Sequence, residues 1–276
     1  MEKTILITGC SSGIGLGCAV GLRARGWRVI ACCRHPDDVA RLSDDGFECL
    51  ALDLSDEASV EATARSVLEL TGGRLDAVFH NAGYGQTGAV EDLAREAVRA
   101  QFETNLFGPW SLTRRLLPAM RGQQSGRIVF NSSIFGFCAM KYRGAYIASK
   151  YAIEGLCDTL RLELSGSGIH VSLIEPGPIE SRFRANALPH FLNNVDVESS
   201  VHCEAYQAQL QRLKKIGAAA PFTLPPEAVL DCLLHALQSS HPRPRYRVTR
   251  PSRLFWYLKR WLPVCWMDRI LLSASR

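Results

Sequence analysis

The sequence predicts an α/β fold in which a single domain is built on a doubly wound parallel sheet, with an insertion late in the chain and a helical C-terminal tail. Three observations carry this prediction. Apolar, β-branched runs alternate with helical patterns, which is the rhythm of parallel strands joined by helices. The runs are apolar at nearly every position, as in strands buried on both faces. A glycine-rich turn separates the first strand from the first helix, where such sheets often bind ligands.

Seven segments have the pattern of strands, and right-handed crossovers between them give the doubly wound order. They cover residues 4–8, 27–33, 48–54, 75–83, 126–133, 169–177 and 245–249. Helical patterns lie at residues 16–26, between the second and third strands, and at 59–70, 93–120 and 146–165. We expect the helix over 93–120 to be broken at Gly108-Pro109 because proline lacks a backbone N–H.

From Pro178 the alternation of strands and helices stops. Residues 179–225 have the character of an irregular insertion with its own helix near residues 198–215. Residues 252–276 form an apolar and basic tail, in which Pro263 should end or kink a helix. No internal repeat or low-complexity linker is present, so we predict one domain over residues 1–276.

The composition is that of an ordinary globular protein, with 47% hydrophobic and 21% charged residues. The net charge of +5 is small for 276 residues, and no nucleic-acid partner is predicted. Ten cysteines without a Cys-x-x-Cys pair favour buried thiols in a reducing compartment, and no metal site is predicted. The chain begins almost at once with a strand, and no apolar run reaches transmembrane length, so we expect a cytoplasmic protein.

The turn "TGCSSGIG" runs from Thr8 to Gly15 between the first strand and the first helix. Gly9, Gly13 and Gly15 allow a tight turn and a close approach of a ligand to the backbone. The helix start behind them offers free N–H groups and a positive dipole end, which suits a pyrophosphate. The alternative is a purely structural turn, but its position after the first strand of a parallel sheet favours a nucleotide.

The second strand ends in Cys33 and Arg34, where an NAD site usually has an acidic residue that binds the ribose hydroxyls. An arginine can instead pair with a 2′-phosphate and stack on adenine. Ser12 in the glycine turn could add a hydroxyl donor. Against the alternative of one more solvated arginine, this pattern favours NADP(H).

Tyr146 and Lys150 are four residues apart in a helical run and therefore share one helical face. They either decorate a surface helix, or the ammonium changes the acidity of the phenol. A free tyrosine has a pKa near 10, and a nearby cation lowers it towards the range where an acid catalyst works best.

Several motifs in order along residues 3–182 now identify a family. They are "TGCSSGIG", "LDL" from Leu52, "HNAG" from His80, "TNLFG" from Thr104, Ser132-Ser133, "YIASK" from Tyr146 and "EPGPIES" from Glu175. In these the chain resembles the classical short-chain dehydrogenase/reductases, which have the Rossmann fold. As a whole it is similar to the bacterial YbbO-type oxidoreductases and, more distantly, to the retinol and 17β-hydroxysteroid dehydrogenases.

The resemblance implies a catalytic tetrad of Asn105, Ser133, Tyr146 and Lys150, with Ser132 the less favoured of the two serines. Asn105 would hold a water that relays protons to Lys150, although an asparagine that caps or bends a helix is the alternative. Lys150 would also bind the nicotinamide ribose.

The resemblance further implies a cofactor site that draws on many segments. Its residues are Gly9, Ser11, Ser12, Gly13, Ile14, Gly15, Arg34, Asp53, Leu54, Asn81, Ala82, Gly83, Tyr146, Lys150, Pro176, Gly177, Ile179 and Ser181. Asp53 would accept from the adenine amino group. Two positions depart from the family: His80 replaces a frequent asparagine, and Ser181 replaces a threonine but keeps a hydroxyl for the nicotinamide carboxamide.

The leading interpretation is an NADPH-dependent reductase of lipophilic aldehydes or ketones, with Tyr146 as proton donor. An alcohol dehydrogenase of hydroxysteroids or retinoids is a second possibility, and a non-catalytic NADPH-binding sensor or scaffold is a third. The family places its substrate lid at residues 179–225, which hold an apolar set suited to such substrates. The set consists of Phe183, Leu188, Phe191, Leu192 and Phe222.

The sequence also raises two possible partners, a second copy of the chain and a membrane surface. Family members often form homo-oligomers through two long helices, here the helix after Asn105 and the helix that carries Tyr146. The aromatic and basic tail suits the interface of a membrane surface, but a core helix or a dimer contact explains it equally well. We expect lid and tail together to wall an apolar pocket beside Tyr146.

Overall fold

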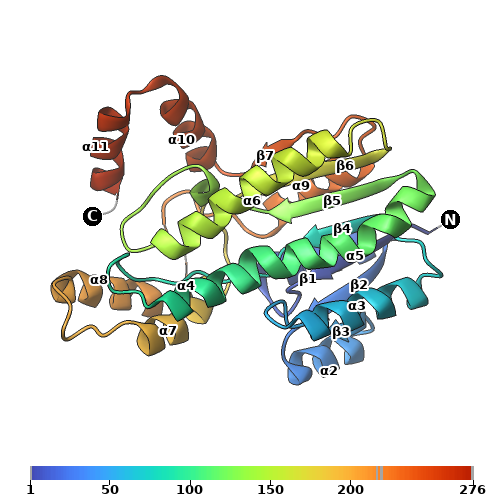
Figure 1. The fold of residues 1–276 in the computed structure, drawn as a ribbon, viewed down its shortest axis with the longest axis horizontal. Helices are drawn as coiled ribbons and strands as arrows, with labels where there is room; N and C mark the ends of the chain where they lie inside the picture. Colours follow the sequence, from blue (N-terminus) through green and yellow to red (C-terminus); the bar gives the residue numbers. More distant parts are fainter. Residues whose placement is uncertain (1, 216, 218–219, 275–276) are drawn as a thin grey trace.

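The computed structural model describes residues 2–215, 217 and 220–274, which fold around one seven-stranded sheet. All strands are parallel, in the order β3-β2-β1-β4-β5-β6-β7. Their bounds are β1 Thr4–Thr8, β2 Arg28–Cys33, β3 Glu48–Ala51, β4 Ala77–His80, β5 Gly126–Asn131, β6 Ile169–Glu175 and β7 Arg245–Arg247. The predicted fold class and all seven predicted strands are confirmed (Figure 1).

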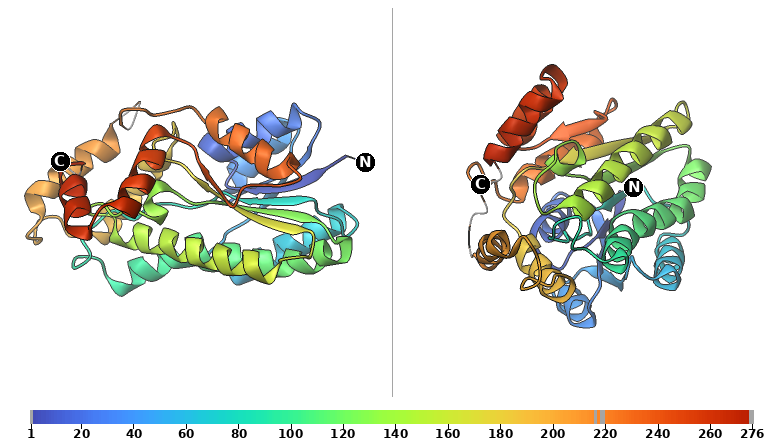
Figure 2. Two further views of the ribbon diagram at one scale, coloured as in Figure 1. Left: turned by 90° about the horizontal axis from the view of Figure 1, so that it is seen from above. Right: turned by 60° about the vertical axis from the view of Figure 1, so that its left-hand side comes forward.

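Helices cover both faces of the sheet (Figure 2). One face packs on α1 (Gly13–Arg23), α2 (Pro36–Asp44) and α9 (Glu227–Gln238), and its core includes Leu22, Leu42 and Leu233. The other face packs on α3 (Glu57–Leu70), α5 (Gly108–Gln123) and α6 (Gly144–Glu163). Because both faces are covered, the central strands carry apolar side chains at consecutive positions, as in Ile5, Leu6 and Ile7.

The order of the sheet reverses at β1. The chain leaves β1 for β2 and β3 on one side and then returns to β4 and the later strands on the other side. The loops after β1 and β4 therefore diverge, and a crevice opens at the carboxyl ends of these strands. The glycine turn lies in the first of these loops and residues 81–83 in the second.

The long helix after β4 differs from the prediction, because it is not broken at Gly108-Pro109. It comprises α4 (Arg95–Phe102), a π-helical turn at Glu103–Phe107 and then α5 without interruption. Pro109 occupies the first turn of α5, where its missing N–H does least harm. The π turn takes up the irregularity and contains Asn105, and such turns often occur at functional sites.

The insertion is more regular than predicted. It contains two helices, α7 (Phe183–Asn194) and α8 (Cys203–Lys214), of which only the second was expected. They enclose a small core of their own with Phe191, Val195 and Tyr206. The hydroxyl of Tyr206 accepts a 2.8 Å hydrogen bond from the backbone N–H of Ala89 and donates to Asp92, so the insertion is attached to the loop after β4.

Two helices form the tail, α10 (Arg250–Trp261) and α11 (Val264–Ala274). The predicted end of the first helix at Pro263 is confirmed, and the chain turns sharply there (Figure 1). Ser252 anchors α10, since its buried hydroxyl donates a 2.8 Å hydrogen bond to the backbone carbonyl of Glu175. No helix within the described residues is both long and apolar enough to cross a membrane.

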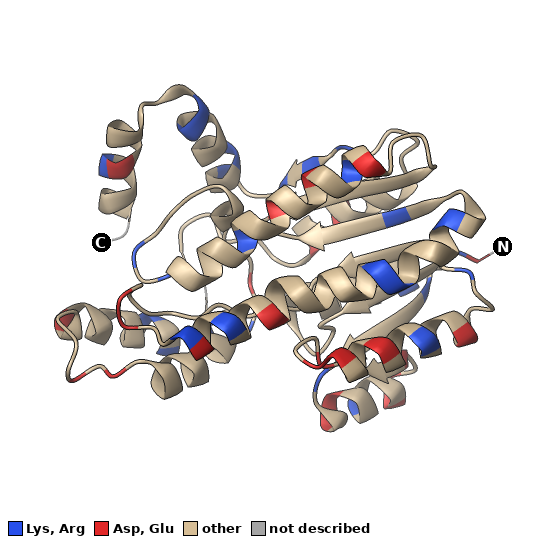
Figure 3. Ribbon diagram, viewed as in Figure 1, with Lys and Arg blue, Asp and Glu red and all other residues tan. Residues whose placement is uncertain are grey.

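Charged residues of both signs are interspersed along α3 and α4, whereas α10 carries Lys and Arg without an acidic residue (Figure 3). Several large apolar side chains of the tail are exposed at the same time, among them Leu254, Tyr257 and Trp261. A core role for the whole of α10 is therefore wrong, because only one of its faces is covered by the rest of this chain.

Candidate active site

The glycine turn packs so closely that larger residues would not fit. A Cβ on Gly9 would lie 2.8 Å from Cα of Ala82, and a Cβ on Gly15 would lie 2.1 Å from the carbonyl oxygen of Gly9. Gly9 and Gly13 have φ values of +73° and +57°, which favour glycine. The turn therefore brings bare backbone to the start of α1.

The start of α1 is free to bind an anion. Its N-cap residue, Ser12, makes no side-chain capping bond, and its first turn contains no acidic residue. Unpaired N–H groups and the helix dipole attract phosphate groups at such a position. These features fit the pyrophosphate of a dinucleotide.

One cavity of about 1110 Å³ runs from this turn to the insertion and the tail. It brings together every predicted cofactor residue except Gly15, and three of the four residues of the tetrad. The lining includes Gly9, Ser11, Ser12, Gly13, Ile14, Arg34, Asp53, Leu54, Asn81, Ala82, Gly83, Ser133, Tyr146, Lys150, Pro176, Gly177, Ile179 and Ser181. Gly15 and Asn105 do not line the cavity.

Arg34 stands at the end of the cavity where the second strand stops. It is exposed and lines the cavity, and its Nη2 lies 3.2 Å from Nε2 of the neighbouring His35. None of the salt bridges among the described residues involves it. Burial lowers the pKa of His190, which also lines the cavity, and the charge of Arg34 lowers it further. A ligand with negative charge would find here a cation without an acidic partner.

Asp53 follows β3 and faces the same end of the cavity. Its Oδ1 accepts two hydrogen bonds from Ser55, of 2.9 Å from the backbone N–H and 2.7 Å from the hydroxyl. These bonds orient the carboxylate and leave Oδ2 available to accept from an amino group.

Asn81 ties the loop after β4 to the glycine turn. Its Nδ2 donates to the backbone carbonyls of Thr8 and Gly9 at 3.0 and 3.1 Å, and its Oδ1 accepts from Nδ2 of Asn131 at 2.9 Å. The amide is thus fully used in holding the ends of β1, β4 and β5 together at the crevice. His80, one residue earlier, is buried in the core.

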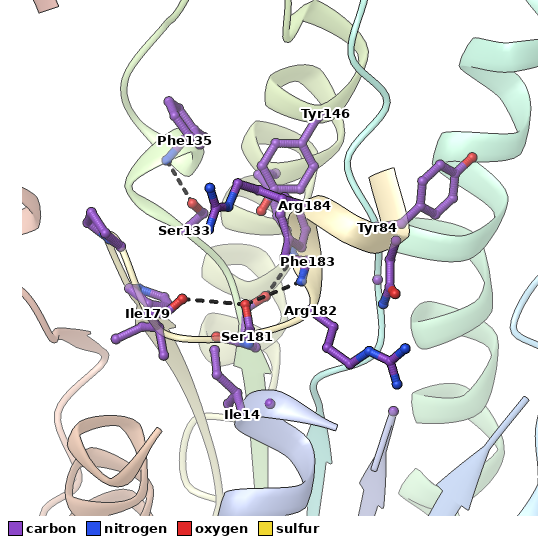
Figure 4. A pocket seen from close by; sticks show the side chains of 18 of the residues that line it. Ile14, Tyr84, Ser133, Phe135, Tyr146, Ile179, Ser181, Arg182, Phe183 and Arg184 are labelled. Carbon is purple, nitrogen blue, oxygen red and sulfur yellow. Dashed lines mark hydrogen bonds between the residues drawn. The ribbon is translucent and has the colours of Figure 1, made fainter. Parts of the chain in front are cut away.

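Tyr146 and Ser133 form the centre of the cavity (Figure 4). Tyr146 comes from the first turns of α6, and Ser133 from the segment after β5. The aromatic rings of Phe135 and Phe183 flank the phenol, with centroids 6.0 and 5.3 Å away. Ser133 Oγ accepts a 3.1 Å hydrogen bond from the backbone N–H of Phe135, which fixes the hydroxyl and leaves its hydrogen to donate.

The two neighbouring serines have different tasks. Ser132 is buried, and its hydroxyl donates a 2.5 Å hydrogen bond to Oε1 of Glu154. Ser133 instead lines the cavity with Tyr146 and lowers the pKa of its phenol. Ser133 is thus the serine whose hydroxyl is not bonded to a carboxylate, and its role beside the tyrosine stays a prediction.

The acidity of Tyr146 differs from the prediction. Burial raises the pKa of its phenol to about 12, although the bond with Ser133 and the charge of Arg143 both lower it. Burial also lowers the pKa of Lys150 to about 8. The expectation of a lowered pKa at Tyr146 is therefore wrong, because burial outweighs the groups that lower it.

Lys150 is nevertheless held firmly beside Tyr146. Its Nζ lies 5.8 Å from the centroid of the phenol ring and donates a 2.7 Å hydrogen bond to the backbone carbonyl of Asn131. One of its three N–H groups is thus used, and the other two remain for a ligand.

Asn105, in the π-helical turn, connects that turn to the loop after β4 and to α6 without lining the cavity. Its Oδ1 accepts from the backbone N–H of Tyr84 at 3.2 Å, and its Nδ2 donates to the carbonyl of Tyr84 at 3.0 Å and to Oγ of Ser149 at 3.1 Å. The side chain therefore joins the loop after β4 to α6. This is a positioning contact, and the predicted water relay to Lys150 stays a prediction.

The insertion and the tail wall the other end of the cavity. Its apolar lining comes from several segments and comprises Phe135, Met140, Phe183, Phe222, Phe255 and Leu271. Of the five lid residues predicted to face a substrate, only Phe183 and Phe222 do so. Phe191 and Leu188 belong to the core of the insertion, and Leu192 is exposed, because α7 must use one face to pack on α8.

Four arginines that the sequence does not predict as site residues lie at this end. Arg143, Arg182, Arg184 and Arg212 all line the cavity. Arg143 is 4% exposed, and its Nε is buried without a hydrogen-bond partner. Nothing in the local sequence marks these residues, since they come from the start of α6 and from the insertion, which meet only in the folded chain.

Comparison with known proteins agrees with this geometry. Residues 3–190 match the family described as short chain dehydrogenase. The uncharacterized oxidoreductase YbbO of Escherichia coli (strain K12) is 45% identical, over 98% of this chain and 94% of its own length. The human 17-beta-hydroxysteroid dehydrogenase type 1 is 34% identical, over 90% of this chain and 78% of its own.

Solved structures with the same fold hold nicotinamide cofactors. A short chain dehydrogenase/reductase from Burkholderia phymatum, in complex with NAD, has a TM-score of 0.78 at 26% identity, covering 94% of this chain and 92% of its own. A variant of the actinorhodin polyketide ketoreductase with NADPH has a TM-score of 0.73 at 28% identity, covering 90% of this chain and 95% of its own. The two neighbours thus hold different nicotinamide cofactors.

Proposed function

We propose that this chain, which belongs to the short-chain dehydrogenase family, is an NADPH-dependent reductase of lipophilic aldehydes or ketones. The observation that carries the proposal is the position of the Tyr146 phenol. It lies beside Ser133 and Lys150, in a cavity that has an anion-binding glycine turn at one end and apolar walls at the other.

A bound nicotinamide cofactor supplies the hydride for this chemistry. Tyr146 then donates its proton to the carbonyl oxygen, while the Ser133 hydroxyl, fixed by the backbone of Phe135, donates a hydrogen bond to the same oxygen. The carbonyl carbon gains the hydride and the oxygen gains the proton, which yields the alcohol. Lys150, whose Nζ already donates to the carbonyl of Asn131, would hold the ribose hydroxyls of the cofactor with its two remaining N–H groups.

Burial raises the pKa of the Tyr146 phenol to about 12, so the phenol carries at neutral pH the proton that reduction requires. The same residue would serve the reverse oxidation, in which the phenolate accepts a proton from the alcohol. The likeness to a human 17-beta-hydroxysteroid dehydrogenase makes the oxidation of hydroxysteroids a second candidate, to be tested with the same protein.

The preference for NADPH rests on the end of β2. Cys33 is the last residue of that strand, at the position where an NAD site usually has an acidic residue. Arg34 lines the cavity without an ion-pair partner among the described residues, and it is available for a 2′-phosphate. Asp38 also lines the cavity, but Arg41 neutralises it at 3.0 Å.

The test is the oxidation of NADPH or NADH in the presence of a panel of aldehydes, ketones, steroids and retinoids. We expect turnover with NADPH on medium-chain aldehydes and a lower rate with NADH. Cofactor binding without consumption over the whole panel would instead indicate a sensor or scaffold.

A homo-oligomer is the quaternary structure that we propose for this enzyme. Support comes from the π-helical turn and from α5, which expose Phe107 and Trp110 at an apolar hollow that α6 lines from the other side. Sedimentation velocity of the wild type and of Trp110→Glu tests this, because a charge at the contact should shift the protein to monomers.

A further inference from the structure

The substrate end of the cavity contains more positive charge than an apolar substrate needs. Six cations line the whole cavity, namely Arg34, Arg143, Lys150, Arg182, Arg184 and Arg212. Its acidic lining consists of Asp38, Asp53 and Glu180. Asp38 and Asp53 are engaged by Arg41 and Ser55 at the cofactor end, and Glu180 is exposed. The cations near Tyr146 therefore lack a carboxylate to balance them.

Arg143 is the centre of this excess. It stands three residues before Tyr146, at the start of α6, and is 4% exposed. Within the described residues its guanidinium makes no hydrogen bond or ion pair, and its Nε is buried without a partner. Burial lowers its pKa to about 9, and the charge of Arg212 contributes to this shift, so it is still a cation at neutral pH. An unpaired buried cation is costly for a fold.

Arg212 extends the excess from α6 to the insertion. It lies in α8, lines the cavity and has no side-chain hydrogen bond or ion pair in the described part of the chain. Burial and the charge of Arg184 lower its pKa. Arg184 itself donates to the backbone carbonyls of Arg212, at 3.3 Å, and Gly217. Arg184 is thus used to hold the insertion together, and Arg182 is exposed. Arg143 and Arg212 are then the two less exposed arginines of this end without a partner among the described residues.

We infer that Arg143 and Arg212 form a subsite for the carboxylate of the substrate, so that the preferred substrates are medium-chain carbonyl compounds with an acidic end. An arginine binds a carboxylate through two parallel hydrogen bonds, and two such groups that face one cavity can share a single anion. The apolar rings of Phe183, Phe222 and Phe255 then cover the chain between the carboxylate and the carbonyl. This inference rests on the proposed reductase function and specifies its substrate.

The cofactor does not account for these two arginines. Its pyrophosphate fits the glycine turn and its 2′-phosphate fits Arg34, which belong to the loops after β1 and β2. Arg143 and Arg212 come from the start of α6 and from α8 and interact with each other electrostatically. Arg143 also acts on the Tyr146 phenol, so the subsite opens into the same cavity as the reacting group.

The test compares a nine-carbon aldehyde that ends in a carboxylate with its methyl ester, which has the same chain but no charge. We expect kcat/KM of the wild type with NADPH to be at least about tenfold higher for the acid, since charged hydrogen bonds are worth about 1.5–3 kcal/mol. Arg212→Gln should remove most of this preference, mainly through KM. Arg212→Lys should keep part of it, because the charge remains without the planar fork.

The matched control is Lys214→Gln, which removes a positive charge from the same helix at an exposed position outside the cavity. It should keep the full preference for the acid. If the wild type reduces the ester and shows no preference for the acid, the subsite is overturned while the reductase function stands. Equal loss of preference in Lys214→Gln and Arg212→Gln would also overturn it.

A binding measurement covers the case in which neither compound is reduced. The binding of decanoate is measured by isothermal titration calorimetry. Decanoate should bind the wild type, and it should bind Arg212→Gln at least about tenfold more weakly, as expected for a lost charged hydrogen bond. That result would uphold the subsite although the reductase function had failed. Equal affinities, or tighter binding of decyl phosphate than of decanoate, would overturn the assignment of a carboxylate.

Discussion

The two ends of the cavity are built on opposite plans. At the cofactor end, backbone and side chains from the ends of β1, β4 and β5 satisfy one another, as Asn81 does with Thr8, Gly9 and Asn131. At the substrate end, helices of the insertion and the tail bring together arginines without partners and rings that are partly exposed. At the first end, hydrogen bonds within the protein hold the framework and leave Arg34 and the start of α1 to bind a ligand. At the second end, the walls themselves contain arginines whose charge a ligand would balance. Tyr146 stands between them.

The largest effect is expected at this boundary. Tyr146→Phe removes the proton donor but little volume, and should lower kcat by about 10²- to 10⁴-fold. Affinity for NADPH, measured by fluorescence titration, should stay nearly unchanged, because the cofactor end is held by other residues. Turnover within a few-fold of the wild type would mean that another group supplies the proton.

Arg34→Ala tests whether the cofactor end discriminates between the two nicotinamide cofactors. If Arg34 pairs with the 2′-phosphate, the loss of a charged hydrogen bond should weaken NADPH by about ten- to a hundred-fold and leave NADH almost unaffected. The matched control is Arg25→Ala, an exposed arginine whose Nη1 donates to the carbonyl of Gly21 away from the cavity. Equal losses of both cofactors would refute the role of Arg34.

Lys150→Met shows what the catalytic geometry costs the fold. The pKa of Lys150 falls from 10.5 to about 8 on burial, which corresponds to about 3 kcal/mol at about 1.36 kcal/mol per unit. The loss of its bond to Asn131 offsets part of this, so we expect the inactive variant to be more stable by about 1 kcal/mol at pH 7 in urea unfolding.

The pH dependence of that difference gives a second readout. The folded chain releases the Lys150 proton near pH 8 and the unfolded chain near 10.5, so the unfolded chain binds more protons between these values and the Lys150 contribution to stability rises with pH. The advantage of Lys150→Met over the wild type should therefore shrink as the pH is raised from about 8 towards 10. An advantage that does not change with pH would contradict the assigned cause, and Lys214→Met serves as the exposed control.

The smallest effect concerns the tail as a wall of the substrate end. Phe255→Ala should lower kcat/KM several-fold for medium-chain aldehydes and little for short ones, because only the longer chains reach this ring. Leu254→Ala changes the adjacent, 55% exposed side chain, which does not line the cavity, and should leave the profile unchanged. A point variant is preferable to truncation before Ser252, since the buried Ser252 hydroxyl bonds Glu175.

The two ends also differ in how far the sequence predicts them. Strands such as Thr4–Thr8 are apolar over most of their length, and the glycine turn has a spacing of its own, so the sheet and the cofactor end follow from local patterns. The helix α7 was missed because Pro189 lies inside it, and a proline at such a position normally indicates the end of a helix. The pair of Arg143 and Arg212 was missed because residues so far apart in the sequence meet only through tertiary packing.

The raised pKa of Tyr146 was missed for a related reason. Spacing on a helix places a cation beside a phenol, but it does not reveal that both groups are removed from water. Burial raises the pKa of the phenol and lowers that of Lys150, and this outweighs the attraction that the spacing suggests.

The position of α11 has a practical consequence for handling the protein. Leu271 and Ala274 line the substrate end of the cavity, while the N-terminal residues lie at the far end of the sheet (Figure 1). A purification tag fused after α11 would lie near the substrate end of the cavity. Acidic residues in such a tag would compete with the substrate carboxylate for the arginines. A tag placed before β1 would stay remote, so assays of substrate selectivity should use N-terminally tagged or cleaved protein.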